Sequence, residues 1–308
     1  MARLTAALVA CVLALAACSS SDGSTSAQAG TQYSAEVATT DLYVDAPLRV
    51  QIGVVHSGDQ GIQLLTSGSI SVTLSPYQGG SGTPISGQAH YVGAPGTEAD
   101  TGTPHLSDPS TARGVYEVDG SFDAVGVWQA DLTFDVDGQP VALSTQFPVA
   151  SKPALPAPGQ EALRTKNLTM SSHVDRVAID SRAQDGTPVP DPELHRDTIA
   201  GAIAAHRAAL VLFATPVYCQ SQFCGPSADA LAQIAKTGPK DTDYIHVEIY
   251  ANYAKHQINH AAADWLLRNN DLTEPWLFLI APDGTIKDRW GPLFDPAQVT
   301  SELRQVAG

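Results

Sequence analysis

The sequence is poor in cysteine, in positive charge and in long apolar runs. Its 308 residues contain only 4 cysteines, and 17 basic side chains stand against 32 acidic ones, for a formal net charge of −15. A chain of this charge repels nucleic-acid phosphates, so no nucleic-acid partner is expected. No segment beyond the first 20 residues is long and apolar enough to cross a bilayer. A hydrophobic fraction of 43% nevertheless suffices for ordinary buried cores.

The N-terminal residues resemble a bacterial lipoprotein signal peptide. Arg3 precedes an apolar segment, Leu4 to Ala17, that is too short to span a bilayer comfortably. The segment ends in the tetrapeptide LAAC at Cys18, which resembles a lipobox. The resemblance implies removal of residues 1–17, lipid attachment to Cys18, and anchoring at the extracytoplasmic face of the cell membrane. An ordinary secretory signal, with Cys18 incidental, is the alternative.

Few cysteines remain after this leader. Cys11 would be discarded with it and Cys18 would carry the lipid, which leaves Cys219 and Cys224. Disulfides persist outside the cytoplasmic membrane. Thiol chemistry in the mature chain therefore depends on these two residues.

Composition and periodicity divide the rest of the chain into four segments. Residues 18–32 are polar and of low complexity, as in a flexible tether. Residues 33–150 alternate apolar and polar side chains, residues 151–193 form a Pro-rich linker, and residues 194–308 alternate strand and helix patterns. The sequence therefore predicts two domains, at 33–150 and at 194–308.

The segment 33–150 is predicted to be all β. From Val127 to Asp137 one strand face is apolar and the other is polar and acidic, as in a half-buried antiparallel strand. Short strands separated by Gly- and Pro-containing breaks favour a β-sandwich. The run from Gly114 to Trp128 resembles immunoglobulin-like modules of bacterial envelope proteins, which implies an immunoglobulin-like sandwich.

The C-terminal segment predicts the element order β-α-β-α-β-β-α, with helices on both faces of a mixed sheet. A buried strand at Ala208–Ala214 is followed by the two cysteines and a helix that opens with Gly-Pro, and Pro275 precedes a later strand. This pattern resembles thioredoxin-like proteins. The resemblance implies an α/β thioredoxin-like fold with Cys219 and Cys224 at the active site and a cis-proline at Pro275 beside them. A trans Pro275 that merely precedes a strand is the alternative.

The position of the two cysteines favours thiolate chemistry. Both lie between a strand end and a helix start, where the unpaired N–H groups of the helix stabilise a thiolate. No carboxylate is expected nearby to oppose ionisation. A dithiol here could exchange with a partner disulfide through a mixed disulfide.

The spacing of the pair departs from the family pattern of two intervening residues, because four residues separate Cys219 from Cys224. Five residues along a helix separate Cα atoms by about 8 Å, beyond the roughly 7 Å limit for a disulfide. A Cys219–Cys224 disulfide therefore requires a loop at 220–223. Such a disulfide could be structural or could exchange, and either cysteine could be the nucleophile.

These observations leave three functional hypotheses. The first is a membrane-anchored, extracytoplasmic thiol–disulfide oxidoreductase that uses no cofactor and acts on the thiols or disulfides of envelope proteins. The second resembles Sco-type copper-assembly lipoproteins, with His246, His256 or His260 as a third ligand beside the two thiolates, which suit Cu(I). The third is a scaffold without catalysis.

Apart from that copper alternative, no metal site is predicted. His256 and His260 stand four residues apart, which would place both on one helical face. The segment between them lacks the Glu of the metalloprotease pattern. His56, His90 and His105 have no spaced carboxylate or cysteine partner either.

Overall fold

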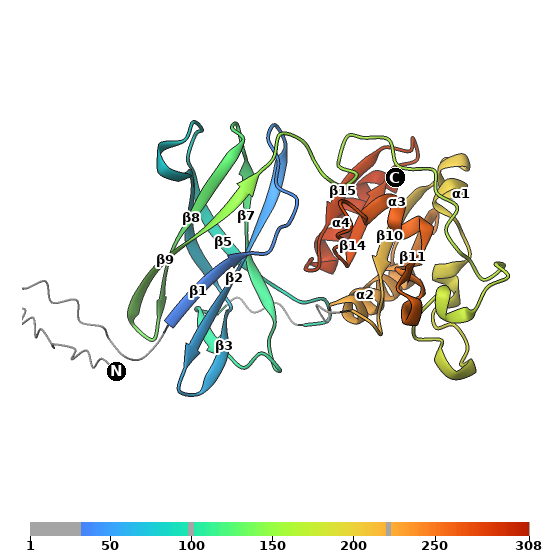
Figure 1. Ribbon diagram of the computed structural model, residues 1–308, viewed down its shortest axis with the longest axis horizontal. Helices are drawn as coiled ribbons and strands as arrows, with labels where there is room; N and C mark the ends of the chain where they lie inside the picture. Colours follow the sequence, from blue (N-terminus) through green and yellow to red (C-terminus); the bar gives the residue numbers. More distant parts are fainter. Residues whose placement is uncertain (1–31, 98–101, 220–222, 308) are drawn as a thin grey trace, which may run out of the picture.

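The computed structural model describes residues 32–97, 102–219 and 223–307 as two bodies side by side (Figure 1). The predicted signal peptide, the lipidation site Cys18 and the tether up to residue 31 lie outside these ranges. Strands β1 to β9 form the first body, and strands β10 to β15 with four α-helices form the second. Among the described residues no helix is both long and apolar enough to traverse a membrane.

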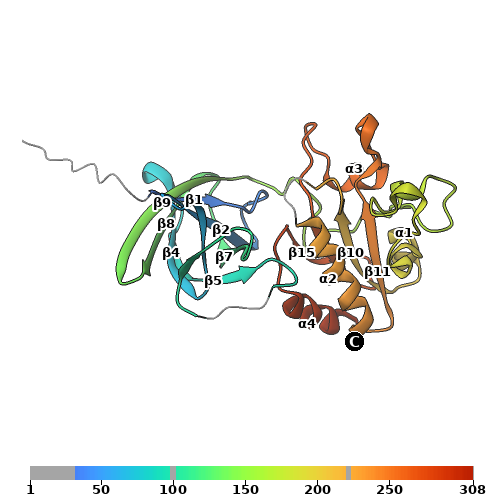
Figure 2. The same cartoon turned by 90° about the horizontal axis from the view of Figure 1, so that it is seen from below.

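The first body is one antiparallel sheet of nine strands in the order β6-β3-β2-β7-β5-β4-β8-β9, with β1 also paired to β2. Its strands are β1 (Gln32–Val37), β2 (Pro47–Gly58), β3 (Gly61–Thr66), β4 (Ser69–Pro76), β5 (Ile85–Gly93), β6 (His105–Ser107), β7 (Gly114–Ser121), β8 (Gly126–Val136) and β9 (Gln139–Val149). Because β1 also lies against β9, the sheet curls back on itself (Figure 2).

Alternating side chains fill the inside of this curl. In β8, Trp128, Leu132 and Val136 point into the core, and the ring of Trp128 meets Phe122 edge to face at 4.9 Å between centroids. The residues between them face outward, as strand geometry requires. The alternation predicted for 127–137 thus places one apolar face of β8 in the core.

The predicted immunoglobulin-like sandwich is wrong. The structure has one continuous nine-stranded sheet, in which the pairing of β5 with β7 joins what a sandwich would keep as two sheets. Alternation along a strand identifies its buried face. It carries no information about which neighbour the strand bonds to, and that neighbour decides the architecture.

The second body is built on a four-stranded sheet in the order β11-β10-β14-β15. Its elements are α1 (Ile199–Ala204), β10 (Ala208–Ala214), α2 (Cys224–Thr237), β11 (Thr242–Glu248), β12 (Tyr250–Asn252), β13 (Gln257–Ile258), α3 (His260–Leu266), β14 (Trp276–Ile280), β15 (Ile286–Trp290) and α4 (Pro296–Ala307). Every residue of β10 is buried, since α1 and α3 pack on one face of the sheet and α2 and α4 on the other. β10 is parallel to β11 and antiparallel to β14.

The predicted α/β thioredoxin-like fold is also wrong. The chain is mostly β, dominated by the nine-stranded sheet, and its described residues hold only four α-helices, so no such fold is evident. Two of those helices, α1 and α3, have only 6 and 7 residues. The physical reason is that alternating apolar runs and helical patterns are local signals. They fix neither the pairing of strands nor the balance of helix and sheet over the whole chain.

The segment between the two bodies is irregular but well packed. It contains three 3-10 turns, η2 (Arg176–Ala178), η3 (Gln184–Gly186) and η4 (Pro192–His195). Side chains of this connecting segment contact the second body: Trp265 Nε1 donates to Thr165 Oγ1 at 3.0 Å, and Asn167 Oδ1 accepts the Ile199 N–H at 2.9 Å.

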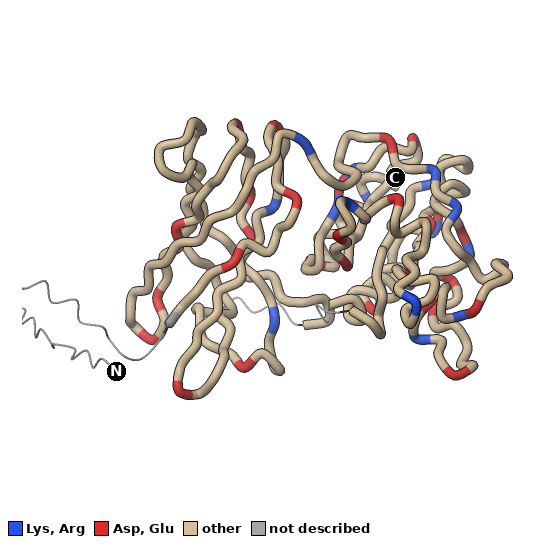
Figure 3. Tube along the Cα trace, in the orientation of Figure 1, with Lys and Arg blue, Asp and Glu red and all other residues tan. Residues whose placement is uncertain are grey.

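Polar and apolar contacts hold the two bodies together. Arg49 of β2 forms a two-pronged ion pair with Asp288 of β15, and Arg289 pairs with Asp41 at 2.8 Å. Basic positions are rare on the first body, where Arg49 and Arg113 are the only ones between residues 32 and 150 (Figure 3). One of its two cations is thus used to contact the second body.

Candidate functional site

The two cysteines form a disulfide where β10 is followed by α2. Cys219 lies in the loop after Ala214, and Cys224 is the first residue of α2. Their Cα atoms are 5.9 Å apart, within the range that a disulfide allows. The pair spans the start of the helix rather than five residues within it. Three of the four intervening residues, 220–222, lie outside the described ranges.

The two sulfur-bearing residues differ in exposure. Cys224 is fully buried in the core that α2 and α4 form with the sheet, while Cys219 is only partly buried. The backbone N–H of Cys224 donates to Sγ of Cys219 at 3.3 Å. This donor belongs to the first turn of α2, so a thiolate formed on Cys219 would gain a hydrogen bond and the positive end of the helix dipole.

The Glu274–Pro275 peptide bond is cis, as the resemblance implied. Pro275 is buried and directly precedes β14, whose Trp276 pairs with Phe213 near the end of β10. The cis-proline thus stands at the start of the strand that pairs with the end of β10, after which the two cysteines follow.

Glu274 is the residue that the sequence analysis missed. One of its carboxylate oxygens and both cysteine sulfurs lie within 4.8 Å of one another. Burial raises the pKa of Glu274, and the charges of Glu248 and Asp271 raise it further. The expectation that no carboxylate lies near the pair is therefore wrong. The signal was available, because Glu274 precedes the proline that the resemblance placed beside the cysteines.

A second carboxyl group is connected to the disulfide loop by hydrogen bonds. Glu248 ends β11 and is 1% exposed, and burial raises its pKa. Its Oε2 accepts the N–H of Ser181 at 2.8 Å, and Ser181 Oγ accepts the N–H of Val217 at 3.2 Å. The loop that carries Cys219 is thereby tied through Ser181 to the end of β11.

Aromatic side chains flank the disulfide loop. The rings of Tyr218 and Tyr253 stack with centroids 4.0 Å apart, and Tyr250 meets both edge to face. Tyr253 is 39% exposed. On the other side of the pair, Phe223 packs with Val115 of β7 and Leu293. The disulfide therefore lies between a partly exposed tyrosine cluster and a contact with the first body.

The histidines proposed as copper ligands are not grouped with the cysteines. The described cluster around the two sulfurs contains Glu274 and no histidine. His246 is buried within β11, and its Nε2 lies 3.1 Å from the carbonyl oxygen of Ala214. His256 and His260 are both exposed, and β13 separates them. The expectation that these two share one helical face is therefore wrong.

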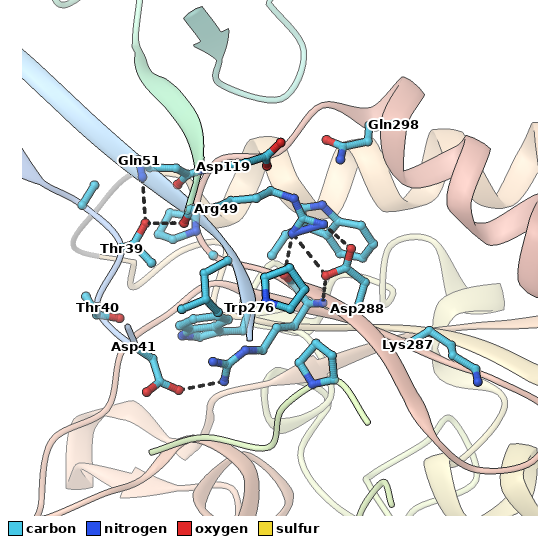
Figure 4. Close-up of a pocket in the computed structure, with 18 residues that line it drawn as sticks. Thr39, Thr40, Asp41, Arg49, Gln51, Asp119, Trp276, Lys287, Asp288 and Gln298 are labelled. Carbon is cyan, nitrogen blue, oxygen red and sulfur yellow. Dashed lines mark hydrogen bonds and ion pairs between the residues drawn. The ribbon is translucent and has the colours of Figure 1, made fainter. Parts of the chain in front are cut away.

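A cavity of about 310 Å³ lies between the two bodies (Figure 4). Arg49, Asp288 and Trp276 line it, and the guanidinium of Arg289 lies 5.2 Å from the Trp276 ring centroid. Its ion pairs are internal, since Arg49 binds Asp288 and Arg289 binds Asp41. The lining, all within the described ranges, includes neither cysteine, so this cavity belongs to the contact between the bodies.

No protein-family model matches the chain, and comparisons with curated proteins and with solved structures gave no significant match. The geometry of the site is therefore the only guide to what the protein does.

Proposed function

We propose that this chain is a thiol–disulfide oxidoreductase that acts on the thiols or disulfides of other proteins through Cys219 and Cys224. The observation that supports this most directly is the hydrogen bond from the Cys224 N–H to Sγ of a partly exposed Cys219, at a helix start. Such a sulfur is reachable by a partner and is a stable leaving thiolate.

The exchange needs no cofactor. A substrate thiolate attacks Sγ of Cys219, the Cys219–Cys224 bond breaks, and its electron pair moves to Sγ of Cys224. A second substrate thiolate then attacks the substrate sulfur of the mixed disulfide and releases Cys219 as a thiolate. The substrate dithiol becomes a disulfide and the protein disulfide becomes a dithiol, with two electrons and two protons transferred. The reverse sequence reduces a substrate disulfide.

Glu274 supplies the proton transfer in this scheme. Its raised pKa keeps the carboxyl protonated to a higher pH than that of an exposed Glu. A protonated Glu274 can donate to the Cys224 sulfur as the disulfide opens and can take the proton back when the disulfide reforms. An ionised Glu274 would instead repel the newly formed thiolate.

The test is disulfide exchange by the full chain. The oxidised protein is mixed with a reduced, unfolded protein dithiol, and thiols are counted on both partners by alkylation and mass spectrometry. Equal loss of substrate thiols and gain of protein thiols at Cys219 and Cys224 supports the proposal. A disulfide that stays intact with every dithiol substrate and also resists a strong reductant contradicts it and leaves the scaffold hypothesis.

A trapping experiment identifies the sulfur that bonds to the substrate. The C224S chain, reduced and mixed with a disulfide-containing protein, should accumulate a mixed disulfide on Cys219, since no second thiol remains to resolve it. The C219S chain is the matched control and should accumulate little, because the remaining Cys224 is fully buried. The opposite pattern would make Cys224 the nucleophile.

The proposal includes lipid attachment at Cys18 and a location at the extracytoplasmic face of the cell membrane. It rests on the apolar leader and the LAAC tetrapeptide. Expressed in a bacterium, the full chain should fractionate with membranes and incorporate labelled fatty acid. The C18S chain should do neither, and labelling that persists in C18S would contradict the proposal.

A second candidate function is copper binding by the reduced pair. The cluster of two sulfurs with a Glu274 oxygen within 4.8 Å supports it, since thiolates are soft donors. The carboxylate would take the place that the Sco-type pattern gives to histidine. Anaerobic loading of the reduced chain with Cu(I), compared with the C219S/C224S chain, tests it. Equal copper content in the two would exclude this site.

A further inference from the structure

Three fully buried side chains meet behind the disulfide loop. Asp180 follows η2, His195 ends η4, and His246 lies within β11, and each is 0% exposed. One potential ligand atom from each lies within 4.8 Å of the other two. Residues from three separate segments thus turn one oxygen and two nitrogens toward a common point.

The hydrogen-bond pattern of His246 shows which of its nitrogens is a lone-pair donor. Its Nε2 lies 3.1 Å from the carbonyl oxygen of Ala214, which can only accept, so Nε2 carries the proton. In a neutral ring Nδ1 then has a free lone pair. That atom faces the negatively charged Oδ2 of Asp180 at 3.4 Å and has no hydrogen-bond partner. Two electron-rich atoms face each other, which is unfavourable unless a cation lies between them.

His195 also turns a ring nitrogen without a hydrogen-bond partner toward Asp180. Its Nε2 lies 3.4 Å from the same oxygen of Asp180, and neither of its ring nitrogens has a hydrogen-bond partner among the described residues. Fully buried nitrogens without partners are rare in folded proteins and call for an explanation.

The distances match a tetrahedral metal site. Zinc binds histidine nitrogen and carboxylate oxygen at about 2.0 to 2.1 Å, so the ligand atoms of a tetrahedron lie about 3.3 to 3.4 Å apart. Both nitrogen-to-oxygen distances to Asp180 Oδ2 are 3.4 Å. A bridging proton gives a shorter separation, usually below about 3.2 Å for N–H···O.

We propose that Asp180, His195 and His246 form a binding site for a divalent cation of the zinc type, with the fourth position left for water. Arg182 supports the carboxylate ligand from outside, because its guanidinium donates to both oxygens of Asp180 at 2.8 to 3.2 Å. Ala214 does the same for His246 through its carbonyl oxygen. Such outer contacts orient metal ligands.

A cation in this site would stabilise the segments that support the disulfide loop. Ala214 is the last residue of β10 before that loop, and Ser181, next to Asp180, binds both Val217 and Glu248. A bound cation would therefore fix the segment around η2 and η4 onto β11, directly under the loop. Arg182, with a side chain 22% exposed, lies between the site and the surface.

The experiment uses the full chain with its disulfide intact, so that no thiolate can bind metal. It is stripped with a chelator and titrated with Co²⁺, whose visible absorption reports tetrahedral coordination. We expect one Co²⁺ per chain, displaced by Zn²⁺, and a rise in thermal stability with Zn²⁺. The C219S/C224S chain should bind equally, which separates this result from the fate of the proposed redox function.

Matched histidine variants locate the metal. H195Q should lose the cobalt absorption, whereas H173Q, which changes an exposed histidine, should retain it. R182Q should weaken the affinity by about 10- to 100-fold, as loss of an outer contact does. If H195Q does not fold, X-ray absorption of the zinc-loaded wild type decides, and two imidazole ligands without sulfur are expected.

Three results would overturn the proposal. One is a wild-type chain that binds no Co²⁺ or Zn²⁺. Another is a folded H195Q chain that binds as the wild type does. The third is a zinc ligand set without two imidazoles.

Discussion

At the scale of single residues, the proposed disulfide exchange depends on the protonation of Glu274. A carboxyl group within 4.8 Å of both sulfurs would act on each step of that exchange in which a thiolate forms. Burial raises its pKa, so it holds its proton into a higher pH range than an exposed Glu does. In the proposed exchange this group would therefore assist disulfide opening when protonated and oppose it when ionised.

The E274Q chain should open its disulfide more slowly, because glutamine cannot donate that proton. At a pH below the pKa of Glu274 the wild type should be faster on the order of 100-fold, the lower end for general acid catalysis. The ratio of the two rates should fall as the pH rises through that pKa. Stopped-flow measurement of thiol release against pH checks this, and a ratio independent of pH would remove Glu274 from the mechanism.

At the scale of secondary-structure elements, the connecting segment stabilises the second body. Asn167 is 4% exposed, and its side chain accepts the N–H of Ile199 and donates to the carbonyl of Asp197 at 3.2 Å. Thr165 accepts from Ala200 through its carbonyl oxygen. These bonds join an irregular strip of chain to the first turn of α1.

The N167A chain should therefore be less stable, because the buried N–H of Ile199 loses its acceptor. The expected loss in free energy of unfolding is about 1 to 3 kcal/mol, the cost of a buried unsatisfied group. The K166A chain is the control, since Lys166 is the exposed neighbour. Urea denaturation of both measures the difference, and equal stabilities would show that the connector does not support α1.

Local patterns predicted single elements well and their assembly poorly. The continuous apolar run at Ala208–Ala214 is β10 without change, because a strand buried on both faces needs nothing but apolar residues. The fold class could not be predicted, since the pairing of β5 with β7 is a long-range contact that the residues of neither strand indicate.

The site was predictable only in part for the same reason. The two cysteines and Pro275 belong to a recognisable local pattern. Asp180, His195 and His246 lie in three separate segments with no common motif, and only the packing of η2 and η4 on β11 brings them together. Glu274 was predictable from the same pattern, because it directly precedes the proline that the resemblance places beside the cysteines.

At the scale of the whole molecule, a few charged groups join the two bodies. Arg49 is one of two basic residues on the first body, and it contacts Asp288, the carbonyl of Arg289 and the ring of Trp290. Glu302 of α4 lies 3.8 Å from the same guanidinium. Arg49 is therefore a single cation that serves several acceptors across this contact.

The R49Q chain should lose part of this contact. Its stability should fall by about 1.5 to 3 kcal/mol, the range for hydrogen bonds to charged groups, and protease should cut the segment between the bodies sooner. K287Q is the control, because Lys287 lines the same cavity but is 43% exposed and makes only a 3.9 Å ion pair. Equal proteolysis rates for R49Q and K287Q would contradict the role of Arg49 in holding the two bodies together.

The contact should also respond to pH through Glu302. Burial and then the neighbouring Asp288 raise the pKa of Glu302 from 4.5 to about 7. The folded chain thus binds this proton more tightly than the unfolded chain, so the stabilisation is complete below pH 4.5 and is lost as the pH rises through 7. The melting temperature of E302Q, measured from pH 4 to 8, should fall less steeply than that of the wild type. Parallel curves would refute this.

The packing of Phe223 restricts the side from which a partner protein can reach the disulfide. Because this residue precedes Cys224 and packs against Val115 and Leu293, the first body shields one flank of the disulfide. A bulky folded partner arriving from that flank would collide with the nine-stranded sheet before its sulfur came within bonding distance. The chain should consequently discriminate by shape, reacting faster with sulfurs on extended tails than with those set deep in compact surfaces.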